Sequence, residues 1–160
     1  MNGLKLRSAT PEDTATILRF INLLAEYERL AHEAVATEEG LREELFGPRP
    51  AAEVVLAERD GAPVGFALFF HNFSTFVGRK GLYLEDLFVL PEHRGKGIGR
   101  ALLSHLAGVA LDRNCGRFEW SVLDWNEPAI RVYRALGAEP LDDWTIQRVT
   151  GEALARLAGR

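Results

Sequence analysis

The sequence contains one cysteine, Cys115, among its 160 residues. A single cysteine cannot form a disulfide within the chain, and it does not supply the ligands of a cysteine-rich zinc site. The four histidines lack the spacing of a metal-binding motif such as H-x-x-x-H. We therefore expect no metal and a reducing, cytoplasmic setting. Because no partner base lies near it in the sequence, Cys115 is not expected to act as a nucleophile.

The chain also lacks an excess of positive charge and a long apolar run. Its formal net charge is −4 and its pI is about 5.6, which argues against nucleic acid or an anionic membrane surface as the main partner. The N-terminus has no apolar stretch of signal-peptide length, and the uncharged window 61–78 contains Pro63, His71 and Asn72, so no membrane span is predicted. The acidic balance is compatible with a small cationic substrate.

What remains is an ordinary globular composition, with 47% hydrophobic and 26% charged residues. The length predicts a single domain over residues 1–160. Periodicity and turn residues predict strands at 4–8, 53–59, 64–70, 82–90, 118–123 and 145–149. They predict helices after Thr10-Pro11, between Thr37 and Gly47, at 98–111, at 127–136 and after Thr150. This order indicates a mixed α/β layer fold.

The most informative string is the glycine-rich turn between the strand at 82–90 and the helix at 98–111, which reads Arg94-Gly95-Lys96-Gly97-Ile98-Gly99-Arg100. Glycines let the backbone approach a bulky anion, and the N–H groups of a helix N-terminus favour a phosphate or diphosphate. The spacing is neither the dinucleotide pattern G-x-G-x-x-G nor a P-loop. A glycine-rich connection without a ligand remains the alternative.

Two motifs in order carry a family resemblance. Arg94, Gly97 and Gly99 fit (Q/R)-x-x-G-x-(G/A), and residues 126–137 fit N-x-x-A-x-x-x-Y-x-x-x-G. The chain thereby resembles the GNAT superfamily of acyl-CoA-dependent N-acetyltransferases. The resemblance implies a splayed mixed sheet flanked by helices, acetyl-CoA as cosubstrate, and a homodimer.

Further strings resemble the diamine and polyamine acetyltransferases within that superfamily. They are LAEYE at 24–28, LYLEDLFV at 82–89, DWNEP at 124–128, and Asp143-Trp144. The loop Phe73-Ser74-Thr75-Phe76 is more similar to the thialysine branch, whose substrates are lysine-like amino acids, than to the polyamine-selective members. The implied acceptor is a primary amine of a thialysine-like or diamine compound. A polyamine, a drug-like amine, a protein amine, or a non-catalytic acyl-CoA-binding module remain alternatives.

The implied reaction needs a base and an acid. A primary amine with a pKa near 10.4 is mostly protonated at neutral pH, so its proton must be removed before it attacks a thioester. The resemblance assigns the base to Glu85, acting through water or directly, and the acid that protonates the leaving thiolate to Tyr133. Glu85 as an ion-pair partner and Tyr133 as a core residue are the alternatives. Strand alternation places Asp86 on the face opposite Glu85 unless a bulge intervenes.

The remaining implied site residues form two sets. Those expected to contact acetyl-CoA are Leu87, Phe88, Val89, Arg94, Gly95, Lys96, Gly97, Ile98, Gly99, Arg100, Asn126, Ala129 and Tyr133. Those expected to contact the amine are Tyr27, Glu28, Ser74, Thr75, Glu85, Asp142, Asp143 and Trp144. Helix capping by Asn126 and solvated surface positions for the acids are the alternatives.

Overall fold

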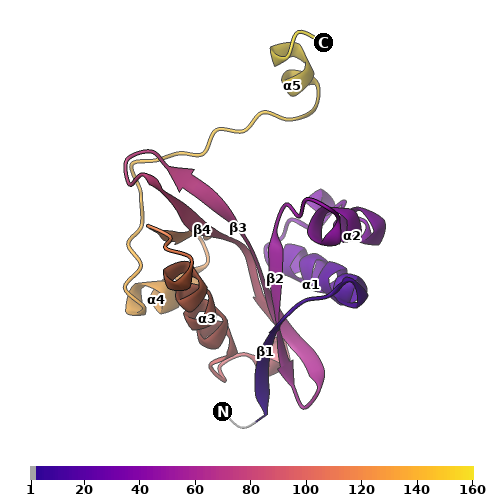
Figure 1. Cartoon of the computed structure of the whole chain (residues 1–160), viewed down its shortest axis with the longest axis vertical. Coiled ribbons are helices and arrows are strands. Elements are labelled where there is room, and N and C mark those ends of the chain that lie inside the picture. The colour runs from indigo at the N-terminus through magenta and orange to yellow at the C-terminus, as the bar shows by residue number, and fades with distance from the viewer. Residues whose placement is uncertain (1–2) are drawn as a thin grey trace. The chain divides into compact units, whose positions relative to one another are not determined.

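The computed structural model describes residues 3–160 (Figure 1). The strands are β1 (Leu4–Ser8), β2 (Glu53–Arg59), β3 (Ala62–Ser74), β4 (Arg79–Val89) and β5 (Phe118–Trp120). The α-helices are α1 (Thr14–Tyr27), α2 (Glu38–Phe46), α3 (Ile98–Asp112), α4 (Glu127–Ala135) and α5 (Gly151–Leu157), and short 3-10 turns are η1 (Pro11–Asp13), η2 (Ala31–Glu33) and η3 (Pro91–His93). The residues group into two compact units that divide after Ser121. The single domain over 1–160 stays a prediction.

The first unit contains one five-stranded sheet in the order β1-β2-β3-β4-β5. Neighbouring strands from β1 to β4 run antiparallel, and β5 runs parallel to β4. The predicted mixed α/β fold is therefore confirmed. Hairpin turns join β2 to β3 at Asp60-Gly61, as predicted, because both residues adopt the positive φ that such a turn requires.

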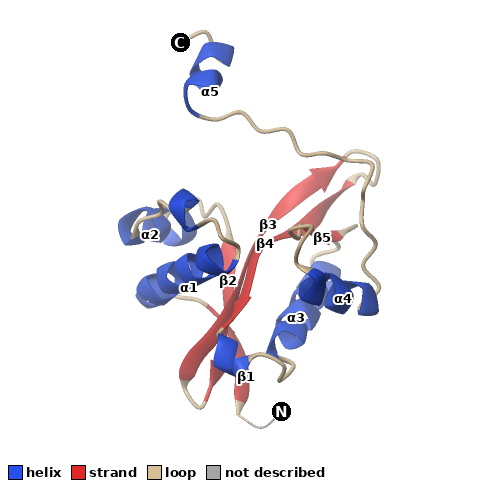
Figure 2. Cartoon of the chain, turned by 180° about the vertical axis from the view of Figure 1, so that it is seen from behind, coloured by secondary structure: helices blue, strands red, loops and turns tan. Residues whose placement is uncertain are grey.

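The sheet is covered on both faces, with α1 and α2 on one and α3 on the other (Figures 1 and 2). On the α1 face, the buried Phe20 ring lies 5.7 Å from Phe66 and 5.9 Å from Phe88, measured between ring centroids. On the α3 face, Leu102 and Leu106 are fully buried. The burial of each of these side chains contributes roughly 2 kcal/mol to folding. Their burial holds β4 between the helices on the two faces of the sheet.

An ion network joins the start of α1 to the sheet. The Arg7 guanidinium donates to Asp13 at 2.7 and 2.9 Å and to Glu58 at 2.7 Å. Arg7 also lowers the pKa of the Asp13 carboxyl to about 2. Asp13 in turn accepts a hydrogen bond from the Thr10 backbone N–H at 2.8 Å. These contacts secure the helix start that Thr10 and Pro11 predict.

The structure departs from the predicted elements mainly near the C-terminus. The strand predicted at 118–123 ends at Trp120, and the strand predicted at 145–149 is absent, because these residues have no regular structure. A strand needs a neighbour for its backbone hydrogen bonds, and none pairs with 145–149 among the described residues. The helix after Thr150 is present, although the Thr150 side chain makes no capping hydrogen bond. No helix within residues 3–160 is both long and apolar enough to cross a membrane.

Candidate active site

The glycine-rich turn lies between η3 and α3, as predicted. Gly95 and Gly97 have φ angles of 71° and 79°, a left-handed conformation that costs other residues about 1–2 kcal/mol. Gly97 is the N-cap residue of α3. No atom lies within 4 Å of the position that a Cβ on Gly95 would occupy. The turn therefore presents bare backbone on its open side.

The first N–H groups of α3 point along the helix axis without acceptors inside the helix. Gly97 has no side chain that could accept from them. Lys96 stays at the loop, because its Nζ donates to the Glu92 carbonyl at 2.7 Å. Backbone donors, the helix dipole and nearby cations together fit a diphosphate, so the turn suits the coenzyme that the sequence implies.

The edge of β4 beyond Leu84 is open to pairing. The ladder between β4 and β5 ends at Leu84 and Trp120, so no described strand pairs with Glu85–Val89 on that edge. Unpaired backbone groups at a sheet edge can bind an extended amide chain as if it were a strand. The Phe88 side chain is only 4% exposed, so Phe88 could contact the coenzyme only through its backbone. The coenzyme contacts of Leu87 and Val89 stay predictions.

A β-bulge in β4 controls the direction of the two carboxylates. Leu84 is paired with Phe69, whereas Asp86 is paired with Leu68, so Glu85 is the extra residue. Phe66 and its partner Phe88 contact Phe20 of α1, so alternation along β3 puts Leu87, paired with Ala67, and Leu84, paired with Phe69, on the α3 face. Glu85 and Asp86 are therefore both displaced to the α1 face. Regular alternation along a strand would place Glu85 and Asp86 on opposite faces, but the extra residue of a bulge interrupts that alternation.

Glu28, directly after α1, joins these two residues in a carboxylate cluster. Burial, followed by the Glu85 and Glu28 charges, raises the pKa of Asp86 from an ordinary value of 3.8 to about 6. Burial and the Glu85 charge also raise the pKa of Glu28. Such a like-charge cluster favours a bound proton or a cation. Sequence reasoning did not select Asp86 as a site residue; its signal was the Glu-Asp pair inside an apolar strand, which only a bulge can place on one face.

Arg94 brings the coenzyme loop next to this cluster. Its Nε donates to the Val89 carbonyl at 2.9 Å, and its Cζ lies 4.8 Å from the centre of the Tyr27 ring. Tyr27 immediately precedes Glu28. Four of the residues predicted to serve the reaction (Tyr27, Glu28, Glu85 and Arg94) are therefore close together in the first unit, together with Asp86.

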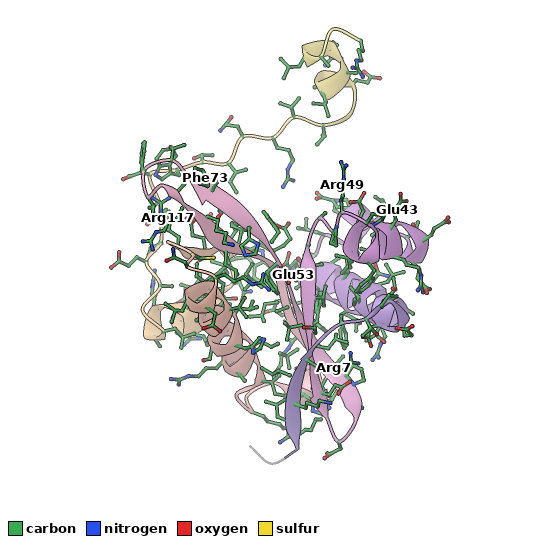
Figure 3. All side chains as sticks on the ribbon, in the orientation of Figure 1. Arg7, Glu43, Arg49, Glu53, Phe73 and Arg117 are labelled. Atoms are coloured by element: carbon green, nitrogen blue, oxygen red, sulfur yellow. The ribbon has the colours of Figure 1, made fainter. Side chains whose placement is uncertain are left out.

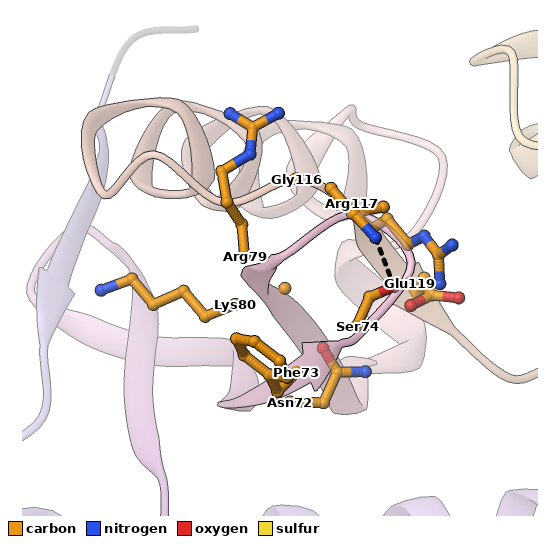
Figure 4. Close-up of a pocket in the computed structure, with 10 residues that line it drawn as sticks. Asn72, Phe73, Ser74, Arg79, Lys80, Gly116, Arg117 and Glu119 are labelled. Atoms are coloured by element: carbon orange, nitrogen blue, oxygen red, sulfur yellow. Dashed lines mark hydrogen bonds between the residues drawn. The ribbon is translucent and has the colours of Figure 1, made fainter.

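The Ser74 and Thr75 positions lie elsewhere in the unit, at the turn between β3 and β4. The Ser74 Oγ accepts a hydrogen bond from the Val77 N–H at 3.2 Å, which stabilises the turn (Figure 4). Beside it is a cavity of about 70 Å³, whose lining includes the cations Arg79, Lys80 and Arg117. Figure 3 shows Phe73 and Arg117 at this end of the sheet. Lys80 and Glu85 are five residue steps apart along β4, roughly 16 Å, so one chain does not bring Ser74 to the carboxylate cluster.

The second unit holds the other predicted residues. Asn126 is the N-cap of α4, and its Oδ1 accepts from the Ala129 N–H at 3.4 Å. The capping alternative is therefore observed, and a coenzyme contact by Asn126 or Ala129 stays a prediction. Tyr133 lies on α4. Asp142, Asp143 and Trp144 are exposed in the segment without regular structure, and their roles stay predictions.

No group of three histidine, cysteine, aspartate or glutamate side chains within residues 3–160 is arranged to hold a metal ion. The carboxylates Glu28, Glu85 and Asp86 lie on the same side of the sheet as Arg94 of the glycine-rich turn. That combination is what acyl transfer from a coenzyme thioester to an amine requires.

Comparison with known proteins agrees with this geometry. The profile of the acetyltransferase (GNAT) family matches residues 17–138. The chain is 40% identical to a thialysine N-epsilon-acetyltransferase of Mus musculus, with all of both chains covered. It is 34% identical to an L-ornithine N5-acetyltransferase of Arabidopsis thaliana, over 96% of this chain and 87% of the relative. A solved integron cassette protein from the V. cholerae mobile metagenome has a TM-score of 0.82 at 27% identity, with both chains fully covered.

The family match covers more than half of the chain, and the full-length relatives exceed 30% identity. The expected family, fold and cosubstrate are therefore confirmed. The chain belongs to the GNAT family of acetyltransferases and is an acetyl-CoA-dependent N-acetyltransferase.

Proposed function

We propose that the enzyme acetylates the primary amine of a small lysine-like diamine such as thialysine. The observation that carries this proposal is the cluster of Glu28, Glu85 and Asp86 beside the glycine loop. Three carboxylates attract a substrate with more than one ammonium group. The full-length relatives that act on thialysine and ornithine, by their names, support the same class of acceptor.

The cluster has two tasks. Glu85 accepts the proton of the reacting ammonium, directly or through water, and so frees the nitrogen lone pair for attack on the acetyl carbon. Asp86 and Glu28 hold positive charge close by, and because their like charges raise the proton affinity of the cluster, it can take up the proton that the ammonium loses. The raised pKa of Asp86, about 6, means that the cluster is fully ionised only above that pH.

Acetyl-CoA supplies an activated thioester when it is bound. The glycine loop would hold its diphosphate, with Gly95, Gly97, Ile98, Gly99 and Arg100 as the residues nearest the anion. The backbone of Leu87 and Val89 would align the extended arm of the coenzyme along β4. Asn126 and Ala129 would contact the same arm from α4, as the second motif suggests.

Tyr133 is the acid in this proposal. As the nitrogen–carbon bond forms, the nitrogen loses its second proton to solvent, and as the carbon–sulfur bond breaks, the Tyr133 hydroxyl donates its proton to the leaving sulfur. The product amide and the free thiol then leave, and Tyr133 regains a proton from solvent. No covalent intermediate with the protein is required.

A panel assay tests the acceptor. Release of free thiol from acetyl-CoA is measured with thialysine, lysine, ornithine, spermidine and a lysine-containing peptide. We expect the highest kcat/KM with thialysine or another lysine-like amino acid. A higher value with spermidine would move the acceptor to the polyamines, and a higher value with the peptide would make the enzyme a protein acetyltransferase.

We further propose a homodimer of single-domain subunits acting in the cytoplasm. Phe73 and Phe76 are 66% and 92% exposed at the β3–β4 turn, and exposed large apolar side chains of this kind favour contact with a second copy. In a dimer, Ser74, Thr75, Asp143 and Trp144 of one subunit could complete the acceptor site of the other. Sedimentation equilibrium of the full chain should give twice the 17.8 kDa subunit mass; a monomer mass would contradict the dimer.

A further inference from the structure

Arg94 and Lys96, two cations of the coenzyme loop, direct their side chains to different partners. The Lys96 Nζ donates to the Glu92 carbonyl in the adjoining η3. The Arg94 side chain instead leaves the turn: its Nε donates to Val89 at the end of β4, and its Cζ lies 4.8 Å from the Tyr27 ring and 5.4 Å from the Phe88 ring. One planar guanidinium thus contacts α1 and β4 while its backbone belongs to the coenzyme loop.

The two rings in contact with Arg94 differ in exposure. Phe88 is 4% exposed and packs against Phe20 in the core, so it forms a fixed wall. Tyr27 is 38% exposed and is the last residue of α1. Arg94 therefore joins a partly exposed ring at the end of α1 to a buried ring of β4.

The consequence for the acceptor site follows from the chain. Glu28 is bonded to Tyr27, and its carboxyl is close enough to Glu85 for the Glu85 charge to raise the pKa of Glu28. Any shift of Tyr27 therefore moves a member of the carboxylate cluster.

We propose that Arg94 is a positioning residue that couples coenzyme binding to amine binding. A diphosphate in the turn fixes the loop and the guanidinium, which fixes Tyr27 and Glu28 in the arrangement that binds the acceptor. This inference rests on the proposed function, since it assumes that the carboxylate cluster binds the amine. Linkage requires that the coenzyme raise amine affinity by the same factor by which the amine raises coenzyme affinity.

Calorimetry with free coenzyme A measures this factor, because no acetyl group is present to transfer. Thialysine is titrated into the full chain with and without saturating coenzyme A, and the ratio of the two dissociation constants is the coupling factor. We expect about five- to tenfold for the wild type, which corresponds to roughly 1–1.4 kcal/mol at 1.4 kcal/mol per tenfold. For Arg94→Met and for Tyr27→Leu we expect a factor near one.

Matched variants separate coupling from simple loss of charge. Lys96→Met removes a cation from the same turn and should weaken coenzyme binding while leaving the coupling factor at its wild-type value. Tyr27→Phe keeps the ring and should also keep the factor. Arg94→Lys keeps the charge but loses the planar face and the Nε donor. Relative to the wild type, its coupling factor should therefore fall by more than its affinity for the coenzyme.

The outcomes are distinct. If Arg94→Met binds no coenzyme, Tyr27→Leu decides, because Tyr27 lies outside the turn. A wild-type factor of one, or an unchanged factor in Tyr27→Leu, would overturn the inference even if the wild type acetylates thialysine. Failure of the wild type to bind or acetylate any amine of the panel would instead contradict the proposed function.

Discussion

The coenzyme turn and the carboxylate bulge lie only a few residues apart on the chain, yet they are built in opposite ways. The turn, residues 94–100, offers backbone N–H groups, and its conformation depends on glycines at positive φ. The bulge at Glu85 and Asp86 offers side chains, and it becomes a site only when Glu28 joins it from α1. An anion site can be local because a helix end supplies its donors. An amine site needs several charges converging from distant segments.

The largest effect should come from the bulge. Glu85→Gln removes the proposed base and should lower kcat/KM by about 100-fold at pH 7, because positioned proton transfer contributes at least that much. Steady-state thiol release measures it, and the dissociation constant of acetyl-CoA should stay the same. Glu43→Gln, on α2 (Figure 3), is the matched control and should change kcat/KM by less than about twofold. Equal losses in both variants would remove Glu85 from the mechanism.

Tyr133→Phe tests the proposed general acid, which lies neither in the glycine-rich turn nor in the bulge. We expect kcat to fall by more than about tenfold with little change in acetyl-CoA binding, because the hydroxyl acts on the leaving sulfur. Tyr83→Phe is the control: the Tyr83 hydroxyl is 2.8 Å from the Ser121 Oγ in the sheet, and its loss should leave kcat within about twofold. Unchanged turnover in Tyr133→Phe would contradict the role.

Gly97→Ala tests the turn. At a φ of 79° an alanine costs about 1–2 kcal/mol, so the turn should relax and acetyl-CoA affinity should fall by about tenfold, while kcat at saturation changes little. Calorimetry measures the affinity. Gly108→Ala, in the interior of α3 with open space around the added Cβ, should bind normally and raise the melting temperature slightly. Equal affinity of both variants would show that the turn does not depend on the glycine conformation.

Asp86→Asn should have the smallest effect of these substitutions, and the effect should be on folding stability. The folded-state pKa of Asp86 is about 6 against an ordinary 3.8, so between these values the folded chain binds the extra proton and stability falls as pH rises. Above about pH 6 Asp86 is ionised in the folded chain, and the loss of stability that its charge causes has reached its full size. We expect Asp86→Asn to raise the free energy of unfolding by about 1 kcal/mol at pH 7.5 and by little at pH 4. The gain at pH 7.5 is small because the side chain keeps some solvent contact.

Urea unfolding at the two pH values measures this difference. Asp112→Asn, an exposed carboxylate at the end of α3, is the control and should show no comparable pH-dependent gain. A gain in Asp86→Asn that is equal at both pH values would mean that the carboxylate cluster does not disfavour ionisation of Asp86.

Much of the fold could be predicted because its signals are local. The Asp60-Gly61 turn, the apolar stripe of α3 and the glycine turn each depend on neighbours within a few residues. The strand predicted at 145–149 failed for the opposite reason: its apolar pattern suits a strand, but a strand exists only where another supplies hydrogen bonds. Tyr133 and Asn126 could be selected by their motif, whereas Asp86 could not, because alternation places it on the wrong face.

The sequence by itself determined the turn and therefore the kind of anion that this protein binds, because left-handed backbone angles and helix ends follow from glycine and short-range hydrogen bonding. Only the tertiary structure decided which carboxylates share a site. The pairing of β4 with β3 sets the bulge that turns Glu85 and Asp86 to one face, and the packing of α1 brings Glu28 and Tyr27 to them. Charge repulsion within that cluster depends on distances that no local pattern encodes.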